Sequence, residues 1–289
     1  SQALGKRGYR VVLVEQSRQL GGRAAKEARL PGLSAWIRVV DYRESQLRQL
    51  KNVEHYFESR MTADEVLTYD FDHVAVATGS TWRRDGVGRW HTHPMTVGEG
   101  MEVLTPDDIL GGVRPRGRRV VLYDDDHYYL GGVLAELLVD EGYEVVLVTP
   151  ASVVSEWTVN TLEQHRIQRR LLEMGVELLL STAVVRASAA GVTLANVFTG
   201  LEADIAADSL VVVTARLPNE KLVFDLEARR DEWGPAGLSS VRAVGDAWAP
   251  GTIAAAVWEG HRYAEELDTE VDPDSTPFRR EVARLSVDP

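Results

Sequence analysis

The feature that most constrains the fold is a strand–helix–strand pattern in the middle of the chain. Val120 to Tyr123 is a short apolar run, Gly131 to Glu141 has the spacing of a helix, and Tyr143 to Val148 is a second run rich in valine. A strand, a helix and a strand within about 30 residues form a βαβ unit, which requires its two strands to be parallel. The chain is therefore predicted to have an α/β fold.

The same alternation of strands and helices extends along the rest of the 289 residues. Apolar runs predict further strands at residues 9–15, 53–57, 71–78, 176–180, 183–187, 192–197, 209–213 and 241–244. Helical spacing is found at residues 33–50, 155–174 and 253–267. The stretch 80–117, rich in turn residues, is the predicted connection between two domains. We expect a discontinuous first domain at residues 1–103 and 236–289 and a second at 104–235, both with largely parallel sheets.

Composition excludes several classes of protein. The chain has no cysteine, which rules out disulfides, thiol redox chemistry and any cysteine-ligated metal centre on it. Its net charge of -12 argues against a nucleic-acid partner, because such partners are held by clustered Lys and Arg. No apolar run approaches the about 18 residues of a membrane span, and no signal peptide is recognised. We expect a cytoplasmic protein that binds neither nucleic acid nor membrane.

The first residues resemble the end of a helix. Ser1 to Lys6 follow no capping residue, and Gly8 is a usual helix terminator. Tyr9 to Glu15 is then a strand that ends in an acid. In a dinucleotide-binding fold, a glycine-rich turn lies roughly 20 residues before such an acid, and this chain has no such turn. We expect the first strand and the glycine loop of the first domain to be missing from the chain.

Two segments near the start are candidate nucleotide contacts. Glu15 is placed to accept hydrogen bonds from the ribose hydroxyls of an adenosine, with a solvated acid at a strand end as the equal alternative. Gly21 and Gly22 allow the backbone to approach a pyrophosphate, and Arg23 would add charge-assisted hydrogen bonds. The alternative for these last three residues is an ordinary loop.

Two further segments follow strands of the same predicted domain. In the first, the backbone leaves the sheet next to the expected nucleotide, at Ala77, Thr78 and Gly79. In the second, Gly245 and Asp246 end a strand and Ile253 begins a helix. This arrangement aims a carboxylate at a ribose or ribityl hydroxyl and a helix N-terminus at a phosphate or flavin. The alternative for Asp246 is a residue that caps the turn.

The turn of the central βαβ unit departs from the nucleotide-binding pattern. A working turn has glycines at its first and third positions, so that backbone N–H groups reach a pyrophosphate. Here Asp124 and Asp126 fill those positions, and carboxylates at close range would repel a pyrophosphate. The second strand ends at Val148 without the acid that NAD uses or an Arg for NADP. We predict that this domain does not bind NAD(P), and a metal site at Asp124 to His127 is the weaker interpretation.

Taken in order, these motifs resemble the trimethylamine dehydrogenase group. That group includes dimethylamine and histamine dehydrogenases, 2,4-dienoyl-CoA reductase and dimethylglycine-demethylating flavoproteins. The resemblance covers nearly the whole chain, and the aspartate-filled turn is similar to the amine-dehydrogenase branch rather than to the NADPH-using branch. The matching segments are LGGR at 20–23, LPGLSAWIRVVDYRESQL at 30–47, MTADEV at 61–66, the strand ending in ATG at 79, LTPDDIL at 104–110, DDDHYY at 124–129, TLEQHRIQRRLLEMGV at 161–176, VVVTAR at 211–216 and VGDAWAPGTIAAAVWEGHR at 244–262.

The resemblance implies two Rossmann-like FAD/NAD(P)-binding domains of an oxidoreductase. In the family, an N-terminal barrel carries FMN, an iron–sulfur cluster and the amine site, and this chain resembles only the two domains that follow it. The first would hold FAD or ADP through Glu15 and the other candidate contacts, with Asp246 on the ribityl chain of FAD. Electrons would pass to an electron-transferring flavoprotein. The catalytic residues would lie on the missing barrel, so none is assigned here, and a homodimer is compatible with the sequence.

Three hypotheses about function follow. The favoured one is the FAD- or ADP-binding portion of a flavin-dependent amine dehydrogenase or N-demethylase, inactive as an isolated fragment. The second is an NAD(P)H-dependent flavin oxidoreductase of the dienoyl-CoA reductase type. The third is a non-catalytic subunit that binds a nucleotide.

Overall fold

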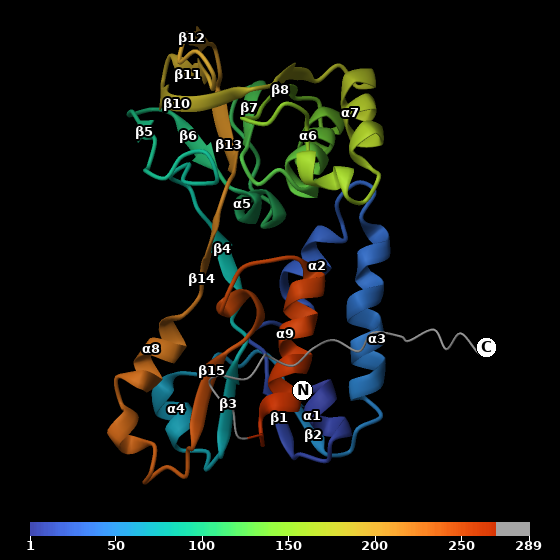
Figure 1. Cartoon of the computed structure of the whole chain (residues 1–289), viewed down its shortest axis with the longest axis vertical. Coiled ribbons are helices and arrows are strands. Elements are labelled where there is room, and N and C mark those ends of the chain that lie inside the picture. Colours follow the sequence, from blue (N-terminus) through green and yellow to red (C-terminus); the bar gives the residue numbers. More distant parts are fainter. Residues whose placement is uncertain (270–289) are drawn as a thin grey trace, which may run out of the picture. The chain divides into compact units, whose positions relative to one another are not determined.

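The chain forms two compact units in a computed structural model that describes residues 1–269 (Figure 1). The first unit contains Ser1–Leu20, Asp41–Gly79 and residues 218–269, and the second contains Gly21–Val40 and Ser80–Leu217. Both have parallel sheets with helices, so the predicted α/β class is confirmed. Among the described residues, no helix is both long enough and apolar enough to cross a membrane.

The division of the chain differs from the predicted domain boundaries at three segments. Residues 21–40 and 80–103 fold with the second unit, and residues 218–235 fold with the first. Packing explains the difference. Leu33 joins a hydrophobic core built largely from the central βαβ unit, whereas Leu226 joins a core that contains Ala63 and Val66 of the first unit. Each segment therefore belongs to the unit whose hydrophobic core buries its apolar side chains.

The second unit is organised around a five-stranded parallel sheet. Its strands, in spatial order, are β6 (Glu102–Leu104), β13 (Ser209–Val213), β7 (Arg119–Asp124), β8 (Glu144–Val148) and β9 (Glu177–Leu179). Helix α6 (Tyr129–Asp140) connects β7 to β8, and α7 (Gln164–Glu173) precedes β9. The predicted βαβ unit is confirmed, with an observed helix that begins two residues before the expected start at Gly131.

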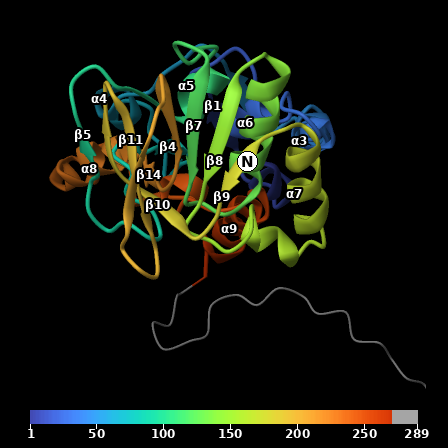
Figure 2. The same cartoon turned by 90° about the horizontal axis from the view of Figure 1, so that it is seen from above.

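The two faces of this sheet are covered by different structures, as Figure 2 shows. Val120 and Leu122 of β7 pack in a core that includes Leu134 and Leu138 of α6. The alternate side chains of β7 pack against an antiparallel sheet. Because both faces are covered, β7 and β13 are apolar along nearly their whole length, which made them easy to recognise in the sequence.

The antiparallel sheet consists of β10 (Thr182–Ser188), β11 (Gly191–Asn196) and β12 (Glu202–Ile205), and β5 (Thr96–Val97) pairs in parallel with β10. Strands β10 and β11 were predicted, whereas β12 was not. The first three residues of β12 are solvent-exposed, so the strand lacks the apolar alternation that reveals a half-buried strand.

Several short elements occupy segments that were predicted as loops or as one long helix. The stretch 80–117 contains β4 (Ser80–Trp82) and α5 (Pro106–Leu110), and β14 (Arg216–Pro218) pairs with β4. The predicted helix at 155–174 is interrupted. A 3-10 turn, η2 (Glu156–Val159), is separated from α7 by Leu162, whose φ of 62° is incompatible with a continuous helix.

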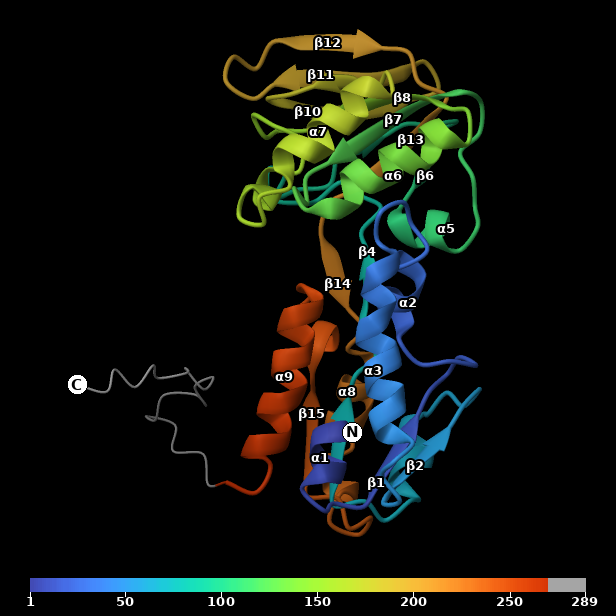
Figure 3. The same ribbon diagram turned by 90° about the vertical axis from the view of Figure 1, so that its right-hand side faces the viewer.

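The first unit contains two separate two-stranded parallel sheets. Strand β1 (Val11–Val14) pairs with β2 (Val53–Tyr56), and β3 (His73–Val76) pairs with β15 (Ser240–Ala243). Figure 3 shows α9 (Ile253–Glu266) running beside β15, where Arg242 of the strand lies 3.2 Å from the carboxylate of Glu266. The remaining helices are α1 (Gln2–Lys6), α3 (Ile37–Leu47, which crosses the unit boundary), α4 (Ala63–Leu67), α8 (Lys221–Glu227) and the 3-10 turns η3 (Arg230–Glu232) and η4 (Gly245–Ala247).

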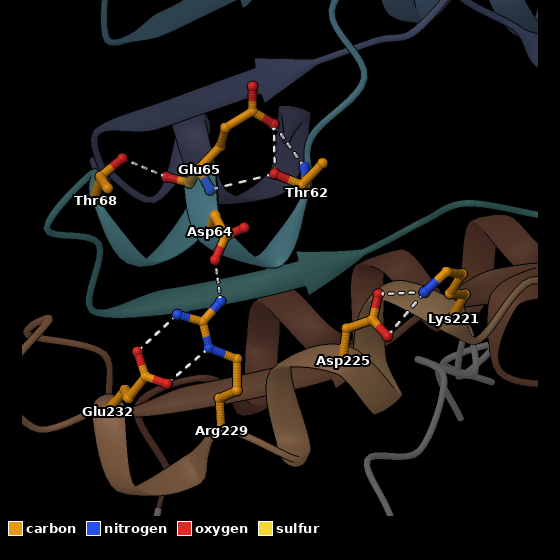
Figure 4. Close-up of polar contacts among 8 residues, drawn as sticks. All are labelled: Thr62, Asp64, Glu65, Thr68, Lys221, Asp225, Arg229 and Glu232. Atoms are coloured by element: carbon orange, nitrogen blue, oxygen red, sulfur yellow. Dashed lines mark hydrogen bonds and ion pairs between the residues drawn. The ribbon is translucent and has the colours of Figure 1, made fainter.

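In the sequence, Thr62 followed three residues later by Glu65 is the pattern of a capping box that opens a short helix, and the structure confirms it at the start of α4 (Figure 4). The backbone N–H of Thr62 donates to Glu65 Oε2 at 2.7 Å, and the backbone N–H of Glu65 donates to Thr62 Oγ1 at 3.4 Å. Nearby, the Arg229 guanidinium donates to Asp64 of α4 and to both carboxylate oxygens of Glu232, at 2.7 and 2.6 Å. These contacts connect α4 to the segment after α8 on the surface of the first unit.

Candidate functional site

Two of the predicted site segments lie together at one edge of the sheet formed by β3 and β15. The strands are parallel, with Ala243 opposite Val76, so their carboxyl ends coincide. Ala77–Gly79 follows one strand, and Gly245–Asp246 follows the other. Ligands of open parallel sheets bind outside the carboxyl ends of the strands. The geometry therefore brings these five residues together at the carboxyl edge of one sheet.

A residue that the sequence analysis did not identify fixes the segment after β3. Asn219 Nδ2 donates to the carbonyl of Thr78 at 3.0 Å, and the backbone N–H of Asn219 donates to the carbonyl of Gly79 at 2.9 Å. In return, Thr78 Oγ1 donates to the carbonyl of Asn219 at 2.6 Å. Gly79 has a φ of +75°, a conformation that favours glycine. Asn219 thus positions the backbone at this edge of the sheet.

Asp246 and the start of α9 form the second part of this edge. Gly245 has a φ of 61° and directs the chain into the turn η4. The half-buried Asp246 accepts a hydrogen bond through Oδ1 from the backbone N–H of Gly251 at 3.0 Å. Thr252 caps α9 by accepting from the N–H of Ala255, and Ile253 is the first helical residue, as predicted. The capping interaction weighed for Asp246 is therefore present.

Glu15 lies at the carboxyl end of the other sheet of the first unit. Its backbone N–H continues the pairing of β1 by donating to the carbonyl of Tyr56 at 2.8 Å. One carboxylate oxygen, Oε1, accepts from both the N–H and the hydroxyl of Ser17, at 2.8 and 2.7 Å. These two bonds hold the carboxylate at the strand end, where it is partly exposed to solvent.

The glycine pair and Arg23 belong to the second unit and lie at the start of a helix, so the ordinary loop that was the alternative interpretation is not found. Gly22 is the first residue of α2 (Gly22–Glu27), and Gly21 caps it with a φ of 104°. Glycine is required at 21 because a Cβ there would lie 2.8 Å from a methyl group of Val40. Gly21, which the sequence suggested as a place where the backbone approaches a pyrophosphate, thus also has a packing role against Val40.

Arg23 is engaged within its own unit. Its guanidinium donates to Asp107 at 3.1 Å and to the carbonyl of Ser80 at 2.7 Å, and it lies 5.7 Å from the ring centroid of Trp82. Asp107 also accepts from the backbone N–H of Trp82 at 2.8 Å. The Arg23 side chain therefore connects α2 to the segment Ser80–Trp82, a role that the sequence analysis did not assign.

The aspartate-rich turn of the second unit buries a carboxylate–histidine pair. Asp125 Oδ1 lies 2.9 Å from His127 Nε2, and its other oxygen accepts from the backbone N–H of Trp90 at 2.8 Å. Burial opposes charge on the imidazole, but the hydrogen bond to Asp125 and the charges of Asp124 and Asp125 raise the pKa of His127. The pair lines a cavity of about 360 Å³ together with Arg89 and Phe198.

Comparison with known proteins identifies relatives over nearly the whole chain. Residues 104–206 match the family described as the OYE-like second alpha/beta domain. Dimethylamine dehydrogenase of Hyphomicrobium sp. (strain x) is 31% identical over 306 residues, which cover 97% of this chain and 41% of that protein.

Two solved structures are also similar. Histamine dehydrogenase from Rhizobium sp. 4-9 shares 51% identity with a TM-score of 0.94, over 98% of this chain and 44% of that one. The 6-hydroxypseudooxynicotine amine oxidase from Pseudomonas geniculata N1 shares 41% identity with a TM-score of 0.88, over 93% and 40% respectively. The chain therefore spans about two fifths of the length of these relatives.

Proposed function

We propose that this chain is the nucleotide-binding portion of a flavin-dependent amine dehydrogenase or N-demethylase. The chain is the counterpart of the C-terminal portion of the trimethylamine, dimethylamine and histamine dehydrogenase family. The observation that carries the proposal is the 51% identity to histamine dehydrogenase over 98% of this chain. Further support comes from a curated relative described as an N,N-dimethylglycine/sarcosine dehydrogenase, 26% identical over 83% of the chain.

The first unit is the proposed site for FAD or ADP. The chemistry of its strand ends fits an adenine nucleotide, because Glu15 offers a carboxylate to ribose hydroxyls and the backbone beside Gly79 is open. Apart from its two chain neighbours, none of the described residues would lie within 4 Å of a Cβ at Gly79. Asp246 would accept from the ribityl chain of FAD, and the start of α9 at Ile253 would face a phosphate or the flavin.

In this proposal the rest of the reaction depends on the part of the relatives that this chain does not span. FMN, an iron–sulfur cluster and the amine site would lie there, since this chain has no cysteine to ligate such a cluster. The chain's own residues bind and orient a nucleotide, and electrons would leave through an electron-transferring flavoprotein. We assign no catalytic residue to the chain.

The first experiment is to denature the full-length protein and identify the released nucleotide by absorbance and mass. ADP without FAD, together with FMN, is expected for an amine dehydrogenase that passes electrons outward. FAD together with FMN and steady NADPH oxidation would favour the alternative, a flavin oxidoreductase of the dienoyl-CoA reductase type. Absence of any flavin, with a bound nucleotide, would favour a non-catalytic nucleotide-binding subunit.

Substitutions then test the proposed contacts. Glu15→Gln should weaken ADP and FAD binding about 10- to 100-fold, since a hydrogen bond to a charged group contributes about 1.5–3 kcal/mol. Asp246→Asn should weaken FAD binding and leave ADP binding unchanged. Glu54→Gln is the matched control, because Glu54 lies on the neighbouring strand and pairs with Arg10 at the surface. Unchanged ADP affinity of the Glu15 variant would contradict the proposed site.

A further inference from the structure

The turn between β7 and α6 occupies the position at which a parallel βαβ unit binds a pyrophosphate. At such a turn, successive backbone N–H groups and the N-terminus of the helix face the anion. In this chain the turn contains Asp124, Asp125, Asp126 and His127. The contacts of Asp124 indicate how this turn is closed.

Asp124 accepts hydrogen bonds from the backbone of its own turn. Its Oδ1 accepts from the N–H of Asp126 at 3.2 Å and from the N–H of His127 at 3.0 Å. These are the groups that a bound pyrophosphate would require as donors. The side chain is completely buried, so it cannot move aside into solvent without rearranging the turn.

The same carboxyl group packs directly on the first turn of α6. A Cβ built at Gly131, the third residue of the helix, would lie 2.4 Å from both Cγ and Oδ2 of Asp124. At the next residue, Gly132, a Cβ would lie 3.2 Å from Ser155 Oγ and 3.0 Å from Ile167. Side chains of the protein therefore already fill the space beside the bare backbone of the helix start.

The rest of the turn is fixed by other contacts. The N–H groups of Asp125 and Asp126 both donate to the carbonyl of Val213 on β13, at 2.8 and 3.1 Å. Asp125 is buried and pairs with His127, which itself has a φ of 65°. These interactions hold the backbone in the arrangement in which Asp124 reaches both the turn and the helix.

We infer that Asp124 is a built-in substitute for a bound phosphate and is the residue that closes the second unit to nicotinamide dinucleotides. Its carboxyl group accepts from the N–H of His127 and, together with the carbonyl of Val213, from the N–H of Asp126, and it fills the space beside α6. A dinucleotide phosphate is therefore excluded because the Asp124 side chain fills its space and accepts the hydrogen bonds that it would need, and not by charge repulsion alone. This inference is independent of the nucleotide proposed for the first unit.

Volume and charge can be separated by substitution in the full-length protein. Asp124→Gly removes the side chain, Asp124→Ser leaves a short hydroxyl acceptor, and Asp124→Asn keeps the volume and removes the charge. Asp126→Asn is the control, because it alters the neighbouring carboxylate and leaves Asp124 in place. NADPH binding is measured by titration calorimetry against the wild-type baseline, and circular dichroism and thermal melting identify the variants that fold.

We expect the two small-residue variants, Asp124→Gly and Asp124→Ser, to bind NADPH at least about tenfold more tightly than the wild type. The NADPH affinity of Asp124→Asn and of the control Asp126→Asn should stay at the wild-type level. Two results would overturn the inference. One is an equal gain in Asp124→Asn, which would assign the exclusion to charge. The other is no gain in either small-residue variant that folds. ADP binding at the first unit, measured in parallel, distinguishes failure here from failure of the proposed nucleotide site.

Discussion

Gly131→Ala is the substitution that most directly tests the packing of Asp124 on α6. Inside a helix, alanine is favoured over glycine by about 1 kcal/mol, so propensity alone predicts stabilisation. The structure predicts the opposite, because the new methyl group would lie 2.4 Å from Cγ and Oδ2 of a fully buried Asp124. Overpacking of a filled interior costs about 1–3 kcal/mol. Displacing the carboxyl group would also break its two hydrogen bonds to the turn, at about 1 kcal/mol each.

The expected net effect is a loss of about 2–4 kcal/mol, after subtraction of the propensity gain. For a domain of about 150 residues, each kcal/mol lowers Tm by about 2–4 °C. Scanning calorimetry is the appropriate assay, because it can resolve separate transitions of the two units. Gly260→Ala is the matched control, since Gly260 lies within α9 and a Cβ there would meet no described atom within 4 Å other than its chain neighbours and the nearby backbone of its own helix. That control should be neutral or stabilising.

A double-mutant cycle isolates the contact. In an Asp124→Gly background the obstructing carboxyl group is gone, so Gly131→Ala should become neutral or stabilising by about 1 kcal/mol. The coupling energy between the two sites should therefore be about 2–5 kcal/mol. If Gly131→Ala is as benign as Gly260→Ala in the wild-type background, Asp124 does not pack on the helix as described, and the reasoning fails.

Two further predictions concern the first unit and the buried turn. Asn219→Ala should loosen the segment after β3 and weaken nucleotide binding about fivefold, because it removes one hydrogen bond worth about 1 kcal/mol. The control is Asn160→Ala, which removes a comparable hydrogen bond to Trp157 in the second unit. In the same titration it should leave the nucleotide affinity unchanged. Stability should also depend on pH, because burial raises the pKa of Asp124 to about 7 from 3.8, and the pKa of His127 is raised as well. A folded state that binds a proton more tightly than the unfolded state is most stabilised below the unfolded pKa, and that stabilisation is lost as the pH rises through the folded pKa. The free energy of unfolding should therefore fall between about pH 4 and 7 in the wild type, and the fall should be smaller in Asp124→Asn; identical slopes would contradict the assignment.

Complete burial and short-range patterns made parts of the fold predictable from the sequence. Strand β13 was predicted at Ser209–Val213 to the residue, because it is buried on both faces and reads as an unbroken apolar run. The capping box of α4 was found because its two partners are three residues apart. By contrast, β12 is exposed, and the break before α7 depends on the backbone of Leu162 rather than on a glycine or proline.

Contacts between residues distant in sequence could not be predicted. Asn219 holds the carbonyl of Thr78 across 141 positions, and Asp107 holds Arg23 across 84. Neither Asn nor Asp has a spacing relative to its partner that reveals the contact. The close approach of Asp124 to Gly131 is similar, since a glycine early in a helix is compatible with a nucleotide-binding turn or with a side chain packed against it.

Asp124 and Asp246 show why the type of residue at a strand end does not by itself define a site. Asp124 is the last residue of β7, and Asp246 follows β15 at the carboxyl edge of its parallel sheet. Both accept hydrogen bonds from the backbone of the turn that comes next. Asp124 is completely buried against a helix, whereas Asp246 is only half-buried. A carboxyl group without solvent access can only complete the interior around it, because any ligand would have to displace it. A partly exposed one can still accept a hydroxyl from outside, and for this reason the proposed nucleotide site lies in the first unit and not in the second.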